Sequence, residues 1–263
     1  MNILITGGNG YIARSLYEAL KEEHYVARIT RSDFDLSNYN DTSNYFKNKY
    51  FDFIIHTAAD GGSRLKEETW GTMDKNLSMY YNLLQNKKSF GKLIHFGSGA
   101  EIHSTHTPYG FSKRVIANSI QDQAGFYNIR IFAVFDENEL ETRFIKANLR
   151  RYVNHQPMEI YQNKFMDFFY MKDLVKLVKY YLSNDDAPKQ IDCSYNTLMD
   201  LVGLAQFINI LDTHEVDIII KEEGFGNDYF GEYKNLGIEY TGLKNAIIDV
   251  YNKLSNEKNK LSN

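Results

Sequence analysis

A tyrosine and a lysine four residues apart, Tyr109 and Lys113, are the residues best suited to chemistry in this sequence. Pro108 fits the start of a helix, so the two side chains fall one turn apart on the same helical face. A free phenol has a pKa of about 10, which is too high for efficient proton transfer at neutral pH. A neighbouring ammonium stabilises the phenolate and lowers that pKa. The spacing therefore predicts that Tyr109 exchanges a proton and that Lys113 tunes it.

Small residues precede this pair in the segment Phe96-Gly97-Ser98-Gly99-Ala100, at the end of an expected strand. They leave room for a substrate, and the Ser98 hydroxyl can donate a hydrogen bond to a ketone oxygen. Because the chain has 20 tyrosines, a Tyr-x-x-x-Lys spacing alone is common. Its coincidence with Ser98 is what favours a catalytic set of Ser98, Tyr109 and Lys113.

A glycine-rich segment near the start of the chain is typical of a phosphate-binding loop. Its spacing is Gly7-x-x-Gly10-x-x-Ala13, between an apolar strand and an amphipathic helix. Gly7 permits a turn with positive φ, and Gly10 lets the backbone approach a pyrophosphate. The amides that open the helix, at Tyr11 and Ile12, then face the anion. The segment predicts dinucleotide binding.

The end of the second expected strand bears on the choice of nicotinamide cofactor. It reads Ile29-Thr30-Arg31-Ser32, with no acidic residue at its tip. An acidic residue there would accept hydrogen bonds from the adenosine ribose of NAD, whereas Arg31 suits the 2′-phosphate of NADP. We therefore expect NADP, while Asp33 and Asp35 close by keep NAD open.

Together these residues resemble the extended short-chain dehydrogenase/reductase family, which includes NAD-dependent epimerases and dehydratases. Further matching segments are Ile55-His56-Thr57-Ala58-Ala59, Asn76 within its helix, residues 167–174 (DFFYMKDL), and Leu236-Gly237-Ile238 before a final helix. The resemblance implies a Rossmann domain, the Ser98, Tyr109 and Lys113 set, and a nucleotide-sugar substrate. It also implies further cofactor contacts from Asp35, Leu36, Thr57, Ala58, Ala59 and Asn76, together with Tyr109 and Lys113.

Within that family the sequence is similar to the branch of GDP-fucose synthases and nucleotide-4-keto-6-deoxysugar reductases. The similar stretches are Ala59-Asp60-Gly61-Gly62 and residues 144–151 (FIKANLRR). The similarity implies that Arg150 or Arg151 contacts the nucleotide diphosphate, since a guanidinium matches phosphate oxygens.

Three departures from that branch narrow the expected reaction. Ala100 and Arg143 replace the cysteine and histidine that the branch uses for 3,5-epimerisation, which favours simple 4-keto reduction. Met166 replaces an arginine, a loss for which Lys164 can compensate. The adjacent Asp–Glu pair of 4,6-dehydratases is missing after Ser98, and Glu101 leaves that reaction only a residual chance.

The elements that must position these residues alternate along the first two-thirds of the chain. Expected strands at residues 2–6, 25–30, 53–56, 93–96 and 129–132 alternate with expected helices at 11–21, 42–49, 73–87 and 109–121. This order predicts an α/β fold, a Rossmann doubly wound parallel sheet with a small C-terminal substrate-binding lobe. We assign residues 1–135 with 166–192 to the cofactor domain and 136–165 with 193–263 to the lobe. Residues 222–233, rich in Gly and aromatics, are expected to form a loop or lid.

Composition excludes several classes of function. The 263 residues have a net charge of −4 with scattered basic residues, which argues against nucleic-acid binding. One cysteine and spread histidines predict no metal site. No apolar run approaches membrane length and the N-terminus lacks a signal peptide, so we expect a cytoplasmic protein. The resemblance implies a homodimer through the helices at 73–87 and 109–121, with Met79 and Tyr80 on their exposed faces.

The leading hypothesis is NADPH-dependent reduction of the 4-keto group of a nucleotide-linked 4-keto-6-deoxyhexose. A nucleotide-sugar 4-epimerase with tightly bound NAD is the enzymatic alternative, because it uses the same catalytic residues. An NADP-binding regulatory protein is the non-enzymatic alternative.

Overall fold

The computed structural model describes residues 1–62 and 67–261. The chain forms two compact units. The first unit comprises Met1–Ile131 and Val178–Asp192, and the second comprises Phe132–Leu177 and Cys193–Asn263. The roles assigned to them from the sequence, cofactor binding and substrate binding, stay predictions.

The first unit is built on a six-stranded parallel sheet with the strand order β2-β1-β3-β4-β5-β9. Its central strands are buried along almost their whole length, as expected where helices cover both faces. The strands are β1 (Asn2–Thr6), β2 (Tyr25–Arg28), β3 (Phe51–His56), β4 (Phe90–Ser98), β5 (Phe126–Ile131) and β9 (Gln190–Asp192). The sequence did not predict β9, because three residues are too few to show a period.

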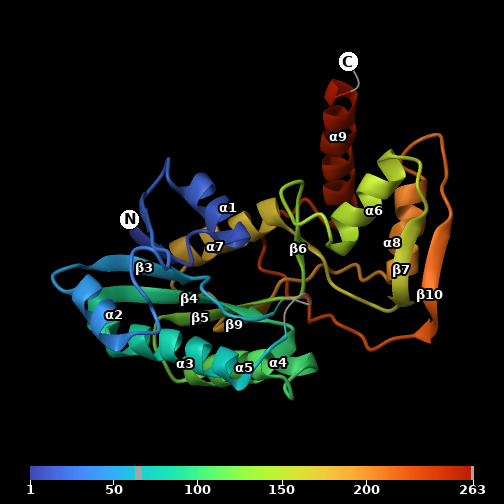
Figure 1. Cartoon of the computed structure of the whole chain (residues 1–263). Coiled ribbons are helices and arrows are strands. Elements are labelled where there is room, and N and C mark those ends of the chain that lie inside the picture. The colour runs from blue at the N-terminus through green and yellow to red at the C-terminus, as the bar shows by residue number, and fades with distance from the viewer. Residues whose placement is uncertain (63–66, 262–263) are drawn as a thin grey trace. The chain divides into compact units, whose positions relative to one another are not determined.

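Helices cover both faces of this sheet (Figure 1). α2 and α3 lie with α5 on one face, and α1 lies with the end of α7 on the other. Their bounds are α1 (Tyr11–Leu20), α2 (Tyr39–Phe46), α3 (Trp70–Gln85), the short α4 (Ala100–His103), α5 (Pro108–Gln121) and α7 (Met171–Ser183). The prediction of a doubly wound Rossmann fold is confirmed, and the predicted helices of this unit are present with ends shifted by a few residues.

Three packed helices and two parallel strand pairs lie in the described part of the second unit, together with the start of α7. α6 (Phe144–Val153) packs against α8 (Leu201–Asn209) and α9 (Leu243–Leu261), burying residues such as Leu149, Leu204 and Val250. β7 (Met158–Asn163) pairs with β10 (Ile218–Phe225), and β6 (Val134–Phe135) pairs with β8 (Phe169–Tyr170). α7 begins in this unit and ends in the first.

The segment at 222–233 is only in part the loop that the sequence predicted, since residues 226–233 lack regular structure apart from a bridge at Tyr229. Its first part belongs to β10, which continues to Phe225. Beyond the strand, the backbone of Tyr229 exchanges hydrogen bonds with Phe165 and Asp167, and the Asp167 carboxylate accepts the Gly231 N–H at 2.9 Å. Glycines and aromatics here serve anchoring and packing, which their composition alone does not distinguish from a mobile loop.

The exposed faces of α3 and α5 also differ from expectation. Met79 and Tyr80 are buried, at 7% and 5% exposure, because they pack in the hydrophobic core of this unit rather than against solvent. The large apolar side chains exposed on these two helices are Trp70, Tyr81, Phe111 and Val115.

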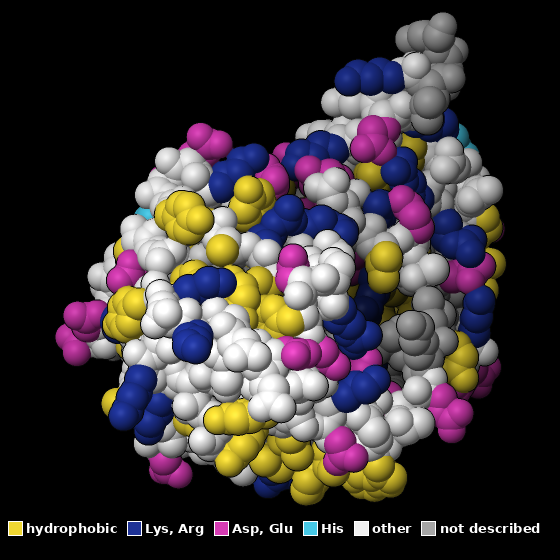
Figure 2. All heavy atoms as spheres, turned by 60° about the vertical axis from the view of Figure 1, so that its left-hand side comes forward, with side chains coloured by type: hydrophobic (Ala, Val, Ile, Leu, Met, Phe, Trp, Pro, Cys, Tyr) yellow, Lys and Arg dark blue, Asp and Glu magenta, His cyan; other side chains and the backbone are white. Residues whose placement is uncertain are grey.

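The surface and the helices bear on the excluded classes of function. Basic and acidic side chains are interspersed over the face shown in Figure 2. Among residues 1–62 and 67–261, no helix combines the length and apolar character needed to cross a bilayer. The same part of the chain holds no cluster of three or more His, Cys, Asp or Glu arranged for a metal ion.

Candidate active site

The order of the strands reverses between β1 and β3, and the glycine-rich loop lies at this point. Ligands of open α/β sheets bind at such a switch point, beyond the carboxyl ends of the strands. Gly7 has φ of +66°, and a Cβ there would come within 2.8 Å of the Ala58 Cα after β3. The Gly8 N–H donates to the Ile29 carbonyl at the end of β2, and Gly10 caps α1. Glycine is therefore required at position 7 by both conformation and space.

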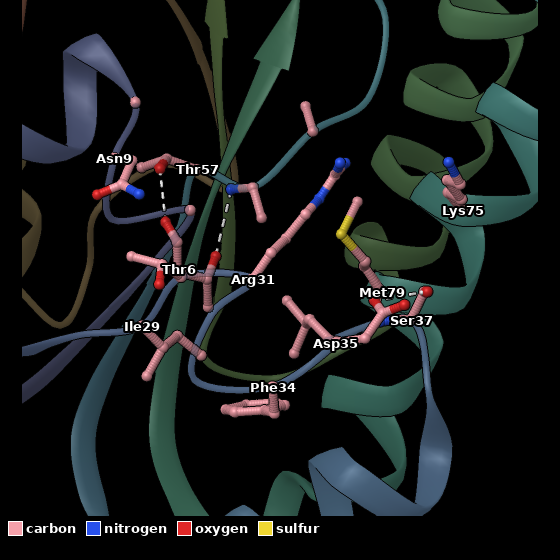
Figure 3. Close-up of a pocket in the computed structure, with 16 residues that line it drawn as sticks. Thr6, Asn9, Ile29, Arg31, Phe34, Asp35, Ser37, Thr57, Lys75 and Met79 are labelled. Carbon is pink, nitrogen blue, oxygen red and sulfur yellow. Dashed lines mark hydrogen bonds between the residues drawn. The ribbon is translucent and has the colours of Figure 1, made fainter.

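A pocket of about 410 Å³ opens beside this loop (Figure 3). Its volume suits a drug-sized ligand or part of a dinucleotide. It brings together predicted cofactor residues from the segments that follow β1, β2 and β3. These residues are Gly7, Gly10, Arg31, Asp35, Leu36, Thr57, Ala58 and Ala59. Tyr11 and Ile12 do not line it but form the first turn of α1, where backbone N–H groups lack intrahelical acceptors.

Two cations flank the pocket. Arg31 extends from the loop after β2 toward the helix that carries Lys75 (Figure 3). Asp60 lies between them, 3.6 Å from Arg31 and 3.7 Å from Lys75. Both cationic side chains are more than half exposed, so these contacts are weak and an anionic ligand can compete for them.

Asp35 places a negative charge in the same pocket. Hydrogen bonds from the Ser37 hydroxyl and backbone N–H hold the pKa of its carboxyl below the usual value. Sequence reasoning missed several residues of this pocket: Asn9, Phe34, Ser37, Lys75 and Met79. Of these residues, only Lys75 could have been inferred from the sequence, because it directly precedes the predicted cofactor residue Asn76.

Asn76 lies apart from the pocket lining and fixes the chain after β3. Its amide accepts the Asp60 N–H at 2.8 Å and donates to the Asp60 carbonyl at 3.0 Å. It also donates to the Ser112 hydroxyl on α5 at 3.1 Å. Asn76, which is 2% exposed, thus links the β3 end, α3 and α5 rather than being open to a cofactor.

Tyr109 lies in the first turn of α5, as the sequence predicts. Pro108 is the first helical residue, and the Thr107 side chain accepts the Gly110 N–H at 3.0 Å. A Cβ on Gly110 would meet the Ala100 carbonyl oxygen at 2.8 Å and the Ser104 carbonyl oxygen at 2.1 Å. The start of α5 therefore packs closely on the α4 segment that follows Ser98.

Lys113 is buried one turn further along α5, at 4% exposure. Its Nζ donates to the Phe96 carbonyl at 2.6 Å and lies 5.7 Å from the centre of the Tyr109 ring. Burial disfavours the ammonium and lowers the pKa of Lys113 to about 8, while the Glu101 carboxylate opposes this shift. Burial also lowers the pKa of His56 to about 3, so that ring adds no second positive charge nearby.

Ser98 ends β4, and its position depends on a buried charged network. The Ser98 backbone N–H donates to Glu101 at 2.9 Å, and the Ser98 hydroxyl accepts the Ala100 N–H at 3.2 Å. Glu101 also accepts from Asn128 at 3.0 Å and from Arg130 at 3.1 Å, and Arg130 pairs with Asp192 of β9. Burial raises the pKa of Glu101, and Arg130 opposes that shift.

The surroundings of Glu101 argue against the 4,6-dehydratase reaction that this residue left open in the sequence. Both oxygens of the Glu101 carboxylate accept hydrogen bonds, and the residue is 2% exposed. A Cβ on Gly97 would come within 2.0 Å of this carboxylate. Glu101 thus holds the backbone at Ser98 in place. A carboxylate enclosed in this way is poorly suited to remove a proton from substrate. Sequence reasoning missed the partners Asn128, Arg130 and Asp192, which no local pattern marks.

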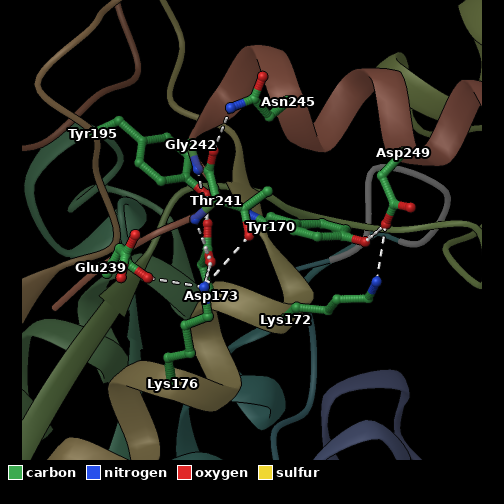
Figure 4. A network of polar contacts seen from close by, with 10 residues as sticks. All are labelled: Tyr170, Lys172, Asp173, Lys176, Tyr195, Glu239, Thr241, Gly242, Asn245 and Asp249. Atoms are coloured by element: carbon green, nitrogen blue, oxygen red, sulfur yellow. Dashed lines mark hydrogen bonds and ion pairs between the residues drawn. The ribbon is translucent and has the colours of Figure 1, made fainter.

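In the second unit, the two aspartates of the segment 167–174 accept hydrogen bonds from other parts of that unit, and Figure 4 shows the contacts of Asp173. Asp173, which is fully buried, accepts hydrogen bonds from the Tyr195 hydroxyl and from the Thr241 and Gly242 N–H groups at the start of α9. Asp167 accepts from Ser194 and Gly231. The matching segment therefore has a scaffold role in this unit.

The predicted substrate-binding arginines lie on α6 in the second unit. Arg150 pairs with Glu257 at 2.8 Å and with Glu141 at 3.4 Å, and Arg151 pairs with Glu159 at 2.7 Å. These contacts are shorter than those of Arg31 and Lys75. A diphosphate bound at either arginine would compete with these carboxylates.

The first unit thus holds a pocket at the glycine-rich loop and, on α5 and at the end of β4, a phenol, a buried ammonium and a hydroxyl. Gly7 and the β1 and β3 ends bound the pocket, and Lys113 binds the strand that ends at Ser98. Such groups can bind a nicotinamide cofactor and exchange a proton with an alcohol or ketone.

Comparisons with known proteins agree with this geometry. The family model described as "NAD dependent epimerase/dehydratase family" matches residues 3–196. Among proteins with curated descriptions, none matches the sequence.

Solved structures share the fold at low sequence identity. A UDP-glucose 4-epimerase from Thermotoga maritima has a TM-score of 0.78 at 16% identity, covering 99% of this chain and 100% of its own. A GDP-mannoheptose C4 reductase from Campylobacter jejuni with NADP bound has a TM-score of 0.78 at 16% identity, covering 96% and 97%. A GDP-L-fucose synthetase from Naegleria fowleri bound to NADP has a TM-score of 0.74 at 15% identity, covering 98% and 93%. With its Rossmann sheet, its glycine loop and a family match over most of its length, the chain belongs to the NAD-dependent epimerase/dehydratase family.

Proposed function

We propose that the protein reduces the 4-keto group of a nucleotide-linked 4-keto-6-deoxyhexose with NADPH. The observation that carries this proposal is the geometry of α5, with Tyr109 in its first turn and the buried Lys113 one turn later. The reductases among the similar structures support the reaction class. The first unit is proposed to bind the cofactor, and the second the nucleotide sugar.

Each catalytic residue has a distinct proposed role. A bound nicotinamide cofactor would supply the hydride for the carbonyl carbon. Tyr109 donates the proton to the carbonyl oxygen, and Ser98 donates a hydrogen bond that orients that oxygen. Lys113, held in place by the Phe96 carbonyl, stabilises the phenolate that remains on Tyr109 and is proposed to bind the ribose hydroxyls of the cofactor.

Residues around the pocket support a dinucleotide with an additional phosphate. Gly7, Gly10 and the amides of Tyr11 and Ile12 are proposed to bind the pyrophosphate. Arg31 and Lys75 are proposed to exchange their ion pairs with Asp60 for contacts with the 2′-phosphate. On α6, Arg150 and Arg151 are proposed to bind the nucleotide diphosphate.

The Tyr109→Phe variant tests the proposed reaction. Without its hydroxyl the residue cannot donate a proton, so kcat should fall roughly 10²- to 10⁴-fold. NADPH binding should stay within about twofold, because the ring still packs in place. Turnover is measured as NADPH oxidation with GDP- and dTDP-linked 4-keto-6-deoxyhexoses, and binding by NADPH fluorescence, with the exposed Tyr25→Phe as control. Wild-type turnover by Tyr109→Phe would refute the assignment.

A nucleotide-sugar 4-epimerase with tightly bound NAD remains the second candidate. Asp35 in the cofactor pocket supports it, since an acidic group suits the ribose hydroxyls of NAD, as do the epimerases among the similar structures. A reductase consumes NADPH stoichiometrically, whereas an epimerase purifies with its cofactor and needs none added. Binding of NADP without turnover of any nucleotide sugar would instead favour a regulatory protein.

A homodimer through α3 and α5 is proposed on the basis of their exposed apolar side chains, Trp70, Tyr81, Phe111 and Val115. Light scattering after size-exclusion chromatography gives the mass that decides this. A cytoplasmic location stays a prediction, which cell fractionation tests.

A further inference from the structure

Two consecutive glycines, Gly61 and Gly62, lie against the ring of Tyr109. Both have positive φ, +80° and +71°. A Cβ on Gly62 would come within 2.9 Å of the Tyr109 Cζ, the ring carbon that bears the hydroxyl. A Cβ on Gly61 would come within 2.6 Å of Thr72 Cγ2 and 3.4 Å of Tyr109 Cδ2. Only glycine satisfies both the conformation and the space at these positions.

Glu68 joins this glycine pair to the start of α5. One carboxylate oxygen accepts the Gly62 N–H at 2.9 Å, and the other accepts the Tyr109 N–H at 3.2 Å. The Tyr109 N–H is among the first of the helix and has no acceptor within it. A carboxylate is also favoured at a helix N-terminus by the helix dipole. Glu68 therefore binds both the backbone of Tyr109 and the segment that covers its ring.

We infer that Glu68 is a positioning residue for Tyr109. By bridging the N–H groups of Gly62 and Tyr109, it holds the glycine pair against the phenol and so fixes the direction of the hydroxyl. Glu68 is not assigned contact with substrate or cofactor, and it acts through Tyr109. This inference rests on the proposed function, in which Tyr109 is the proton donor.

The expected consequence is a loss of turnover without a loss of cofactor binding. When a reacting group moves by about 1 Å, the rate falls by up to about 100-fold. Glu68→Ala removes both acceptors, so kcat should fall about 10- to 100-fold. Glu68→Gln retains one acceptor oxygen but presents an N–H donor to the second N–H, so it should lose a similar factor.

The experiment compares these variants with Glu67→Gln, which changes the exposed neighbouring carboxylate. kcat, KM and the Kd of NADPH are measured with GDP- and dTDP-linked 4-keto-6-deoxyhexoses, and the melting temperature is measured for each variant. The inference predicts a lower kcat for both Glu68 variants, with KM, the Kd of NADPH and melting temperature close to wild type. The Glu67→Gln control should keep wild-type kcat.

Gly62→Ala tests the same inference from the other side of the contact. Its methyl group would push the Tyr109 ring aside, so kcat should fall at least about 10-fold. Gly237→Ala is the matched control, because Gly237 also has positive φ but open space around it.

The outcomes separate this inference from the proposed function. Inactive Tyr109→Phe together with Glu68 variants that keep kcat within twofold would leave the function standing and overturn the positioning role. A parallel loss of kcat, NADPH affinity and melting temperature in both Glu68 variants would also overturn it, because that pattern indicates a general structural role. Fully active Tyr109→Phe would overturn the function itself.

Discussion

Lys113 in the first unit and Glu139 in the second are both buried ionisable side chains with a pKa of about 8, reached from opposite directions. Burial lowers the pKa of the lysine and raises that of the glutamic acid, because each charged form loses its hydration. The Lys113 Nζ donates to the Phe96 carbonyl, and the nearby Glu101 carboxylate opposes the lowering of the Lys113 pKa. Among the described residues, the Oε2 atom of Glu139 has no hydrogen-bond partner.

Burial alone therefore does not mark a functional group. Lys113 lies one helical turn from a phenol, and its Nζ binds β4 near the carboxyl end of the sheet, the end at which the pocket opens. Glu139 lies in the segment before α6, where its backbone carbonyl accepts a hydrogen bond from Lys146. We therefore expect the titration of Lys113 to appear in turnover and that of Glu139 to appear in stability.

The largest expected effect comes from Lys113→Met, which keeps the length and apolar packing of the side chain but removes the ammonium. kcat should fall roughly 10²- to 10⁴-fold, because the phenolate of Tyr109 loses its stabilising charge. In the wild type, turnover should fall as pH rises through about 8, where the buried ammonium loses its proton. Steady-state kinetics from pH 6 to pH 10 measure both effects.

Arg114→Met, at the exposed neighbouring position, is the control for Lys113→Met. A Lys113→Met variant that retained more than a tenth of the wild-type kcat, while Arg114→Met kept wild-type kcat, would contradict the role assigned to Lys113.

A smaller effect is expected on stability from Glu139→Gln. The folded state of the wild type binds an additional proton between the unfolded pKa of 4.5 and the folded value of about 8. Its free energy of unfolding should therefore fall as pH rises through this range, by on the order of 2–4 kcal/mol. The variant should lose this part of the pH dependence, which urea unfolding at pH 5, 7 and 9 measures.

For this measurement, Glu215→Gln is the control at an exposed carboxylate of the same unit. Equal pH dependence in wild type and Glu139→Gln would show that Glu139 is ionised in the folded protein at neutral pH.

The smallest effect concerns the surface cations of the two units. Arg31 and Lys75 are weakly paired, at 3.6 and 3.7 Å, whereas Arg151 contacts Glu159 at 2.7 Å. Arg31→Ala and Lys75→Ala should each raise the Kd of NADPH about 10-fold, which is about 1.4 kcal/mol, and change that of NADH little. Arg151→Ala should leave both unchanged. Isothermal titration measures these constants, and equal losses for NADPH and NADH would remove the proposed role in cofactor choice.

Local sequence signals were enough to predict most of the framework. The positive φ of Gly7, the helix start at Pro108 and the turn from Tyr109 to Lys113 depend on neighbouring residues, so spacing reveals them. The parallel sheet follows from the alternation of strands and helices, because parallel pairing requires crossover helices. The helix boundaries were predicted less accurately and the short strand β9 was not predicted, since helix ends and three-residue strands carry little periodic signal.

The Rossmann fold was therefore predictable from the alternation of strands and helices, and the three catalytic candidates from the spacing of Tyr109 and Lys113 and from Ser98 at the end of the preceding strand. Three features depend instead on the folded chain: Glu68 binds the start of α5, Lys75 lines the pocket, and Asn128 and Arg130 enclose Glu101. The hydrogen bonds of Glu68 and Glu101 named here join residues 27 to 41 positions apart, on different elements or loops. Their hydrogen bonds and charges form only after the sheet brings distant segments together, so no local pattern encodes them.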